Sequence, residues 1–233
     1  KAMGCTTIMQ CGDFGFVWDN DIGKVNQVLD WVDGVLRNAG LTLVFLPGNH
    51  ENHPMLARLA EAADRNEDGH YILRPTILYT GRVAAWTWSG LRLAAVGGAA
   101  SIDSDLRVAG ESWWPEEVLQ PHEVERAAAL GPVDILFSHD APVGVPVRLV
   151  PDVTSMAHRE YMTFIGGQLA PAYWFHGHYH SSIHYKFVRW GGVTTVRGLH
   201  CNHAARRTDA MVAINLAAIR DGLSVKQYRE GPA

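Results

Sequence analysis

The sequence has few cysteines and no long hydrophobic run, and both absences narrow the class of protein. No segment reaches the roughly 18–20 consecutive apolar residues of a membrane-spanning helix, so no membrane contact is predicted. Cys5, Cys11 and Cys201 are odd in number and lack CxxC spacing, which excludes a disulfide framework and a thiolate zinc cluster. The first ten residues show no signal-peptide pattern. We therefore predict a cytoplasmic protein.

The sequence also lacks an excess of basic residues. Its 20 Lys and Arg against 24 Asp and Glu give a formal net charge of -4. A mildly acidic chain has no general attraction to nucleic acid or anionic lipid, so nucleic acid is considered only as a substrate, held at most in a local basic groove. The 8 Trp, 7 Tyr and 7 Phe exclude a disordered chain, because so many aromatic side chains need a packed core.

What is present is an alternation of strand and helix patterns along 233 residues. Continuous apolar runs indicate strands buried on both faces, and a helical period indicates amphipathic helices. The expected helices lie at 21–38, 52–65, 116–130 and 156–169, and the expected strands at 6–10, 41–46, 76–80, 82–88, 91–96, 133–137, 172–175, 182–188, 193–197, 211–215 and 223–228. The chain has no repeat, low-complexity run or linker. We predict a single α/β domain over residues 1–233 that contains a second sheet.

Polar residues that can bind metals follow four of the apolar strands. These segments are Gly12-Asp13-Phe14-Gly15, Gly48-Asn49-His50-Glu51, Ser138-His139-Asp140 and His176-Gly177-His178-Tyr179-His180. In open α/β sheets ligands bind at the carboxyl edge of the strands, so we expect these side chains to converge. A carboxylate, an amide oxygen and several imidazoles suit Mn, Fe, Zn or Ni better than Ca or a thiolate site. The glycines before the ligands would allow sharp turns and close backbone approach.

Taken together, the four motifs resemble those of a known family. GD-x-x-G, GNH-E, SH-D and GH-x-H, in this order within residues 6–180, look like motifs two to five of the calcineurin-like metallophosphoesterases. The resemblance implies a two-sheet α/β/β/α sandwich that hydrolyses a phosphate ester at two divalent metal ions. The stretch at 97–117 is similar to a segment of phage and bacterial members, and it does not define a substrate.

The resemblance also implies a role for each matching residue. Asp13 matches the carboxylate that bridges the two metals. His50 matches a histidine that acts near the leaving-group oxygen, as general acid or as charge stabiliser. The other implied ligands are Asn49, His139 and His178 for the second metal and His180 for the first.

The first motif of the family, a D-x-H that follows its first strand, has no counterpart at the start of this sequence. Residues 1–4 look like the end of a helix, so we expect a further strand and helix of ~25–30 residues before them. The only D-x-H, Asp68-Gly69-His70, lies in a polar stretch and is interpreted as a solvated turn. With the first site reduced to Asp13 and His180, we expect one bound metal and weak or no activity from this chain alone.

The loop at 101–117 (SIDSDLRVAGESWWPEE) has two interpretations. It is either a lid packed on the core or the rim of a substrate site. In a rim, Arg107 would bind a phosphate and Trp113 or Trp114 would stack on a ring. His176 matches no ligand of the family and is interpreted as a supporting residue.

We therefore predict a metal-dependent phosphoesterase that acts on a small phosphodiester or phosphomonoester through metal-activated water. The alternative is a non-catalytic metal- or phosphate-binding protein that kept the second metal site and lost the first. A metallo-β-lactamase-like hydrolase is disfavoured because the aspartate of its H-x-H-x-D-H motif is absent after His180. The acidic charge balance disfavours a dedicated nucleic-acid-binding protein.

Overall fold

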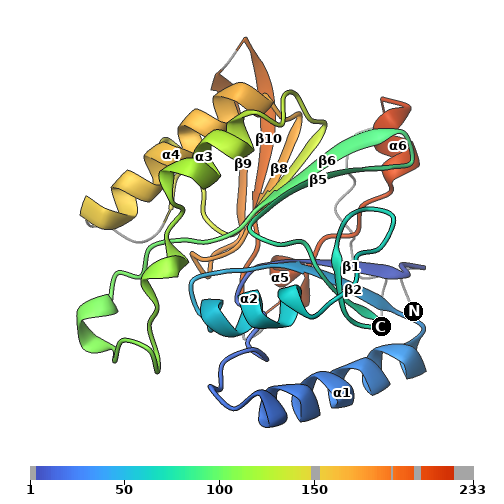
Figure 1. The fold of residues 1–233 in the computed structure, drawn as a ribbon. Helices are drawn as coiled ribbons and strands as arrows, with labels where there is room; N and C mark the ends of the chain where they lie inside the picture. The colour runs from blue at the N-terminus through green and yellow to red at the C-terminus, as the bar shows by residue number, and fades with distance from the viewer. Residues whose placement is uncertain (1–3, 148–152, 190, 202–205, 223–233) are drawn as a thin grey trace.

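The structure, a computed structural model, describes residues 4–147, 153–189, 191–201 and 206–222 and is built from two mixed sheets with helices (Figure 1). The smaller sheet has the order β1-β2-β4-β3 and the larger sheet the order β5-β6-β7-β8-β10-β9. The strands are β1 (Thr7–Cys11), β2 (Thr42–Leu46), β3 (Tyr71–Arg74), β4 (Ile77–Tyr79), β5 (Val83–Trp88), β6 (Leu91–Val96), β7 (Ile135–Ser138), β8 (Tyr173–His176), β9 (Ile183–Arg189) and β10 (Gly192–Gly198). The helices are α1 (Ile22–Ala39), α2 (His53–Glu61), α3 (Pro121–Ala128), α4 (Val153–Leu169), α5 (Arg207–Ala210) and α6 (Leu216–Arg220), with short 3-10 turns η1 (Ser104–Leu106) and η2 (Pro115–Glu117).

Three hydrophobic clusters arrange these elements in layers. One cluster, which includes Leu29 and Phe45, packs α1 and α2 on the smaller sheet. Another, which includes Met162 and Trp174, packs α3 and α4 on the larger sheet (Figure 1). The third includes Phe137 and joins side chains from both sheets. The prediction of an α/β chain with two sheets is confirmed.

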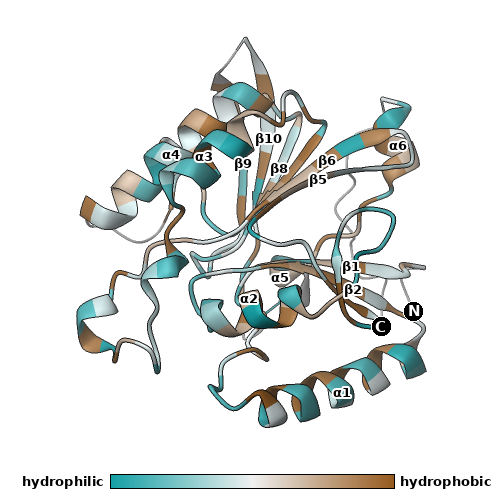
Figure 2. Cartoon of the chain, in the orientation of Figure 1, coloured by the Kyte–Doolittle hydropathy of each residue, from teal (hydrophilic) through white to brown (hydrophobic). Residues whose placement is uncertain are grey.

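The helix α1 shows how local sequence signals set the element boundaries. The Asp21 side chain accepts a hydrogen bond from the backbone N–H of Gly23 (2.8 Å) and starts the helix. Gly40 ends it with φ 63, a left-handed conformation that glycine adopts without strain. Figure 2 shows hydrophobic and hydrophilic residues alternating along α1, whose buried side chains include Val25 and Leu36.

Several predicted boundaries differ from the structure. Helix α2 ends at Glu61 instead of residue 65. Helix α3 begins at Pro121 instead of residue 116, because the 3-10 turn η2 occupies the start of the predicted helix. The four-residue strand β3 was not predicted. The predicted strand at 211–215 is wrong: the segment is irregular and leads into α6, whose first turn Asn215 caps.

The segment at 211–215 is apolar, as a strand would be, but within the described part of the chain it pairs with no strand of either sheet. Val212 and Ile214 pack against the cluster between the sheets, which accounts for the apolar pattern. The predicted strand at 223–228 and residues 1–3 of the predicted helix end lie outside the described residues. None of the described helices is long and apolar enough to cross a membrane.

Candidate metal centre

The candidate residues lie on loops that leave the carboxyl ends of four strands, two from each sheet. Cys11 at the end of β1 pairs with Leu46 at the end of β2, and Ser138 at the end of β7 pairs with His176 at the end of β8. Both pairs are parallel, so within each sheet the two loops start side by side. The His139 side chain, which follows β7, then connects the two sheets.

The imidazole of His139 is buried at the centre of the site. Its Nδ1 lies 2.6 Å from the backbone carbonyl oxygen of Cys11, and its Nε2 lies 3.0 Å from Oδ1 of Asn49 and 3.3 Å from Oδ1 of Asp13. Because a carbonyl oxygen only accepts hydrogen bonds, Nδ1 carries a proton and Nε2 faces the two side-chain oxygens. The structure therefore brings an imidazole from the larger sheet to two oxygen ligands from the smaller one.

The charges in this cluster support one another. Burial acts to lower the pKa of His139, but the Asp13 carboxylate outweighs it and raises that pKa to about 9. Burial acts to raise the pKa of Asp13, but the charge and hydrogen bond of His139 outweigh it and hold that pKa well below the usual range. The His178 ring lies 5.0 Å from the His139 ring, and burial, followed by the His139 charge, lowers the pKa of His178 to about 4. The site thus offers an ionised carboxylate and a neutral imidazole beside His139.

Two glycines, Gly12 and Gly48, leave the space that His139 and Asp13 occupy, and a third, Gly177, packs closely on the end of β1. A Cβ atom on Gly12 would lie 2.2 Å from Nδ1 of His139, and one on Gly48 would lie 2.2 Å from Oδ1 of Asp13. A Cβ atom on Gly177 would lie 2.9 Å from the carbonyl oxygen at the end of β1. A side chain at Gly12 or Gly48 would therefore collide with His139 or Asp13, and we call these two glycines the glycine cradle.

Backbone strain is concentrated in the same loops. Asp13, His178 and His180 have φ angles of 55, 66 and 46, in the left-handed region that non-glycine residues rarely adopt. Among the described residues, only Ser89 and Ala170 are other non-glycine residues with positive φ. Conformations of this kind cost about 1–3 kcal/mol each and persist where the surrounding structure enforces them, commonly at functional sites.

The amide of Asn49 is fixed by a hydrogen-bond chain from the loop at 101–117. Nδ2 of Asn49 donates to Oγ of Ser101 (2.8 Å), and Oγ of Ser101 donates to Oε2 of Glu117 (2.6 Å). The backbone N–H of Ser101 donates to Oε1 of Glu117 (2.7 Å). Burial raises the pKa of Glu117, against the opposing hydrogen bonds from Ser101. Sequence reasoning assigned no role to Ser101 or Glu117.

Glu51 belongs to the polar segment predicted after β2 and to the GNH-E motif, but the sequence assigned it no individual role. Its buried carboxyl group accepts hydrogen bonds from the backbone N–H groups of Gly48 (2.5 Å) and Gly15 (3.3 Å). It therefore ties the loop after β1 to the loop after β2. Burial, followed by the nearby charge of Asp13, raises the pKa of Glu51 to about 7. The position of Glu51, three residues after Gly48, was the sequence signal that could have indicated this hydrogen bond.

His50 and Arg107 lie together on one side of the cluster. The two terminal guanidinium nitrogens of Arg107 lie 2.6 Å from Nδ1 and 3.2 Å from Nε2 of His50. Arg107 also forms an ion pair with Asp103 (2.8 Å), while the backbone N–H of His50 donates to Oδ1 of Asp13 (3.1 Å). Burial lowers the pKa of His50. The predicted substrate-binding arginine therefore reaches the predicted catalytic histidine.

The two tryptophans of the loop do not form a stacking platform together. Trp114 is buried and meets Trp18 edge to face, with 5.5 Å between the ring centroids. Trp18 in turn lies 6.0 Å from the His50 ring. Because its ring is covered, stacking of Trp114 on a substrate ring is wrong, and the interpretation as a packed lid holds for this residue. Trp113 is half-buried.

Asp140 supports both histidine-bearing loops of the larger sheet without facing the cluster. Its Oδ2 lies 2.7 Å from Nδ1 of His158 in α4, and its Oδ1 accepts hydrogen bonds from the Tyr179 hydroxyl and the Ala141 N–H. Tyr179 stands between His178 and His180 in the chain, so this network anchors the GH-x-H loop against α4. His176 is fully buried at the end of β8, as expected of a supporting residue.

Asp13 and His180, the two residues predicted for the first metal, do not lie together as Asp13, Asn49 and His139 do. His180 is exposed, and no interaction between it and Asp13 is seen in the described part of the chain. The only D-x-H forms part of a turn, as predicted, but the turn is not solvated at His70, whose side chain is fully buried. Asp68 accepts a hydrogen bond from Nε1 of Trp88 (2.9 Å), and the His70 ring packs 4.7 Å from the Trp86 ring.

The chemistry of the donor set bears on whether a metal fits. Among the described residues, no group of three or more His, Cys, Asp and Glu side chains is placed so that it could hold a metal ion. The set at this edge instead mixes Asp13 and His139 with the amide oxygen of Asn49, and the His178 ring lies beside it. A histidine whose other nitrogen donates to a carbonyl is typical of metal ligands. These donor types suit a divalent ion such as Mn, Fe, Zn or Ni.

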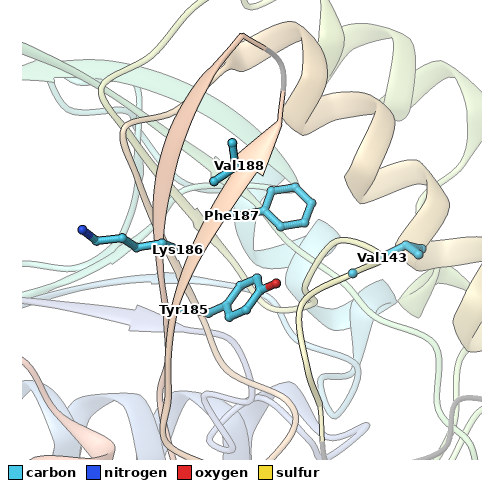
Figure 3. Close-up of a pocket in the computed structure, with 6 residues that line it drawn as sticks. Val143, Tyr185, Lys186, Phe187 and Val188 are labelled. Carbon is cyan, nitrogen blue, oxygen red and sulfur yellow. The ribbon is translucent and has the colours of Figure 1, made fainter.

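A hollow of about 360 Å³ lies elsewhere, against β9 at the outer edge of the larger sheet (Figure 3). Tyr185, Phe187 and Val143 line it, and none of the predicted site residues does. Its lining offers no converging set of ligand side chains, so the candidate site remains the edge around His139.

Comparisons with known proteins add little. No family model matches the sequence, and no curated protein is significantly similar to it. A solved structure described as a hypothetical protein from Thermus thermophilus is similar over 74% of this chain, with a TM-score of 0.37 and 14% sequence identity. The alignment spans 60% of that chain. Because this likeness is too weak to carry an argument, the function must be argued from the site.

Proposed function

We propose that the chain is a metal-dependent phosphoesterase with the calcineurin-like sandwich, and that it hydrolyses a small phosphodiester or phosphomonoester. The observation that supports this most directly is the meeting of His139, from the larger sheet, with Asp13 and Asn49, from the smaller sheet, within 3.3 Å. These side chains come from three separate motifs, and the resemblance assigns all three to the same metal ion.

The ion would be held by Asp13, Asn49, His139 and His178, with Mn²⁺ proposed and Fe, Zn or Ni chemically suitable. A bound ion of this kind lowers the pKa of its water and offsets negative charge on the phosphoryl group. The chain itself fixes the donors in advance. The Cys11 carbonyl directs Nε2 of His139, and the glycine cradle lets Asp13 approach it. His180 would contribute to a second ion that shares Asp13.

Arg107 and His50 would bind the substrate phosphate and the leaving group. The guanidinium of Arg107 is a permanent positive charge with several donors, which suits phosphoryl oxygens. Because burial lowers the pKa of His50, the imidazole is neutral at pH 7, and a cation nearby would keep it so. A neutral imidazole can stabilise charge on the leaving oxygen by donating a hydrogen bond. We therefore favour the role of charge stabiliser over that of general acid.

A non-catalytic binding protein is the second candidate, and the exposure of His180 favours it. Such a protein would bind one ion at the cluster around His139 and a phosphate at Arg107 without turning it over. The two candidates share the same ligands and differ only in turnover.

Hydrolysis of bis-p-nitrophenyl phosphate and p-nitrophenyl phosphate, with and without Mn²⁺, separates the two. A phosphoesterase releases p-nitrophenolate only with the metal, and Asp13→Asn abolishes this release because it removes the carboxylate charge. Asp30→Asn, at an aspartate whose side chain is 66% exposed, serves as the control and should retain activity. Calorimetric Mn²⁺ binding without turnover would favour the binding protein. Neither binding nor turnover would contradict both candidates.

A further inference from the structure

We propose that Glu117 is a positioning residue of the metal centre, acting through Ser101 to turn the amide oxygen of Asn49 toward the bound ion. The inference rests on the proposed function, because it assumes that Asn49 is a metal ligand. It assigns a role to both ends of the 101–117 loop, for which the resemblance implied none.

The three residues form a buried chain with no gap. Ser101 is 4% exposed, Glu117 is 2% exposed and Asn49 is 3% exposed. The heavy-atom distances are 2.8 Å from Nδ2 of Asn49 to Oγ of Ser101 and 2.6 Å from that oxygen to Oε2 of Glu117. The buried polar groups of these three residues therefore satisfy one another, as buried polar groups generally do.

The direction of the chain follows from what each group can donate. The carboxyl group of Glu117 accepts hydrogen bonds from both the backbone N–H and the hydroxyl of Ser101, so the single proton of that hydroxyl points toward Glu117. The hydroxyl oxygen can then only accept from Asn49, and the side-chain group of Asn49 that faces it must be the NH₂. The amide oxygen is thereby turned to the opposite side, where Nε2 of His139 lies 3.0 Å away.

Loss of the carboxylate would remove this constraint. With glutamine at position 117, the amide NH₂ can donate to the Ser101 hydroxyl, which is then free to donate to the oxygen of Asn49. The Asn49 amide would turn over, and an NH₂ group would face the metal site. An NH₂ group has no lone pair available for a cation, so the ligand would be lost although its side chain remains in place.

The same loop carries Arg107 between these two ends, so the loop serves the metal site and the substrate site together. Its ends orient Asn49, and its middle places a guanidinium 2.6 Å from Nδ1 of His50. The backbone of Glu117 is itself held, since its carbonyl accepts hydrogen bonds from both terminal nitrogens of Arg82 (3.4 and 3.3 Å). Glu117 is thus a fixed point from which the orientation of Asn49 is set.

The test compares Mn²⁺ affinity, by calorimetry, in the parent chain, Glu117→Gln, Ser101→Ala and the control Glu116→Gln, whose side chain is exposed. We expect both test variants to weaken binding about 10- to 100-fold, as expected when a partner of a metal ligand is removed. The control should match the parent. The visible absorption of Co²⁺ bound at the site should also change in Glu117→Gln, because one oxygen ligand is lost, whereas a merely structural role would leave it unchanged.

Two outcomes would overturn the inference alone. One is a folded Glu117→Gln whose Mn²⁺ affinity is within twofold of the parent and whose Co²⁺ spectrum is the same. The other, should Glu117→Gln fail to fold, is an unchanged affinity in Ser101→Ala, which removes only the hydroxyl. If the parent chain itself binds no Mn²⁺, the proposed metal centre fails and this inference fails with it.

Discussion

The loops after β7 and β8 both carry candidate imidazole ligands, but they are held in different ways. His139, after β7, is buried, and its ring is fixed at both nitrogens by Cys11, Asn49 and Asp13. In the loop after β8, His178 is half-buried and His180 is exposed, both on left-handed backbone. Contacts between the two sheets thus fix the part of the site that contains His139, Asp13 and Asn49. The part that contains His178 and His180 is held by the backbone conformation of the GH-x-H loop and by the hydrogen bond from Tyr179 to Asp140.

Replacing His139 by alanine should have the largest effect. The change removes a proposed ligand and leaves the oxygens of Asn49 and Asp13 without their shared partner. We expect Mn²⁺ affinity to fall by at least about 100-fold, the upper end of what loss of an outer partner of a ligand produces. Calorimetry would measure the affinity, and circular dichroism would verify the fold. A folded variant with the parent's affinity would remove the centre of the proposed site.

A substitution at Gly48 perturbs the site without replacing any of the proposed ligands. In Gly48→Ala the new Cβ would lie 2.2 Å from Oδ1 and 2.4 Å from the backbone nitrogen of Asp13, so rotation of a side chain cannot relieve the collision. We expect the free energy of unfolding to fall by about 1–3 kcal/mol and Mn²⁺ binding to weaken. The matched control is Gly34→Ala in α1, where nothing lies within 4 Å of the new Cβ.

Urea unfolding measures both glycine variants. Gly34→Ala should raise the free energy of unfolding by about 0.5–1 kcal/mol, because alanine favours a helix over glycine. Equal losses in the two variants would show that the contacts around Gly48 do not set the site.

Metal affinity should depend on pH through His139. Its pKa is raised to about 9, so in the metal-free protein it holds a proton at pH 7 that a bound metal must displace. Apparent Mn²⁺ affinity should therefore rise about tenfold per pH unit between pH 6.5 and 8.5 and level off above about 9. His178, whose pKa is lowered to about 4, adds no proton in this range. Calorimetric titrations across the range measure the slope, and a flat profile would contradict the His139–Asp13 pairing.

The sequence predicted the parts of this arrangement that follow from local pattern. Apolar runs located most of the strands, and the motifs after four of them located the loops that carry Asp13, Asn49, His139 and His178. Once strand ends are known, parallel pairing brings the loops of one sheet to a common edge, so this convergence needs no knowledge of distant contacts.

What sequence reasoning missed depends on pairing between distant segments. Glu117 reaches Asn49 through Ser101 in two steps, at sequence separations of 16 and 52, and no periodicity marks such a chain. The segment at 211–215 was predicted as a strand, and its apolar side chains Val212 and Ile214 pack between the sheets. Apolar residues report burial, whereas a strand also needs a hydrogen-bonding neighbour, which the local sequence does not specify.

Replacing His180 should have the smallest effect on Mn²⁺ affinity. Comparing it with the replacement of His178 tests whether the two histidines of the GH-x-H loop serve different ions. His178 lies with its ring 5.0 Å from that of His139, so His178→Ala should weaken Mn²⁺ binding about tenfold or more, as removal of a ligand requires. His180 is exposed, so His180→Ala should change the affinity for a single ion less than threefold, roughly the scale of a surface substitution. Both substitutions fall on left-handed backbone, with φ 66 and 46, which makes the two variants matched controls for strain. Equal losses would mean that both imidazoles reach the same ion, and the assignment of His180 to a separate ion would then be wrong.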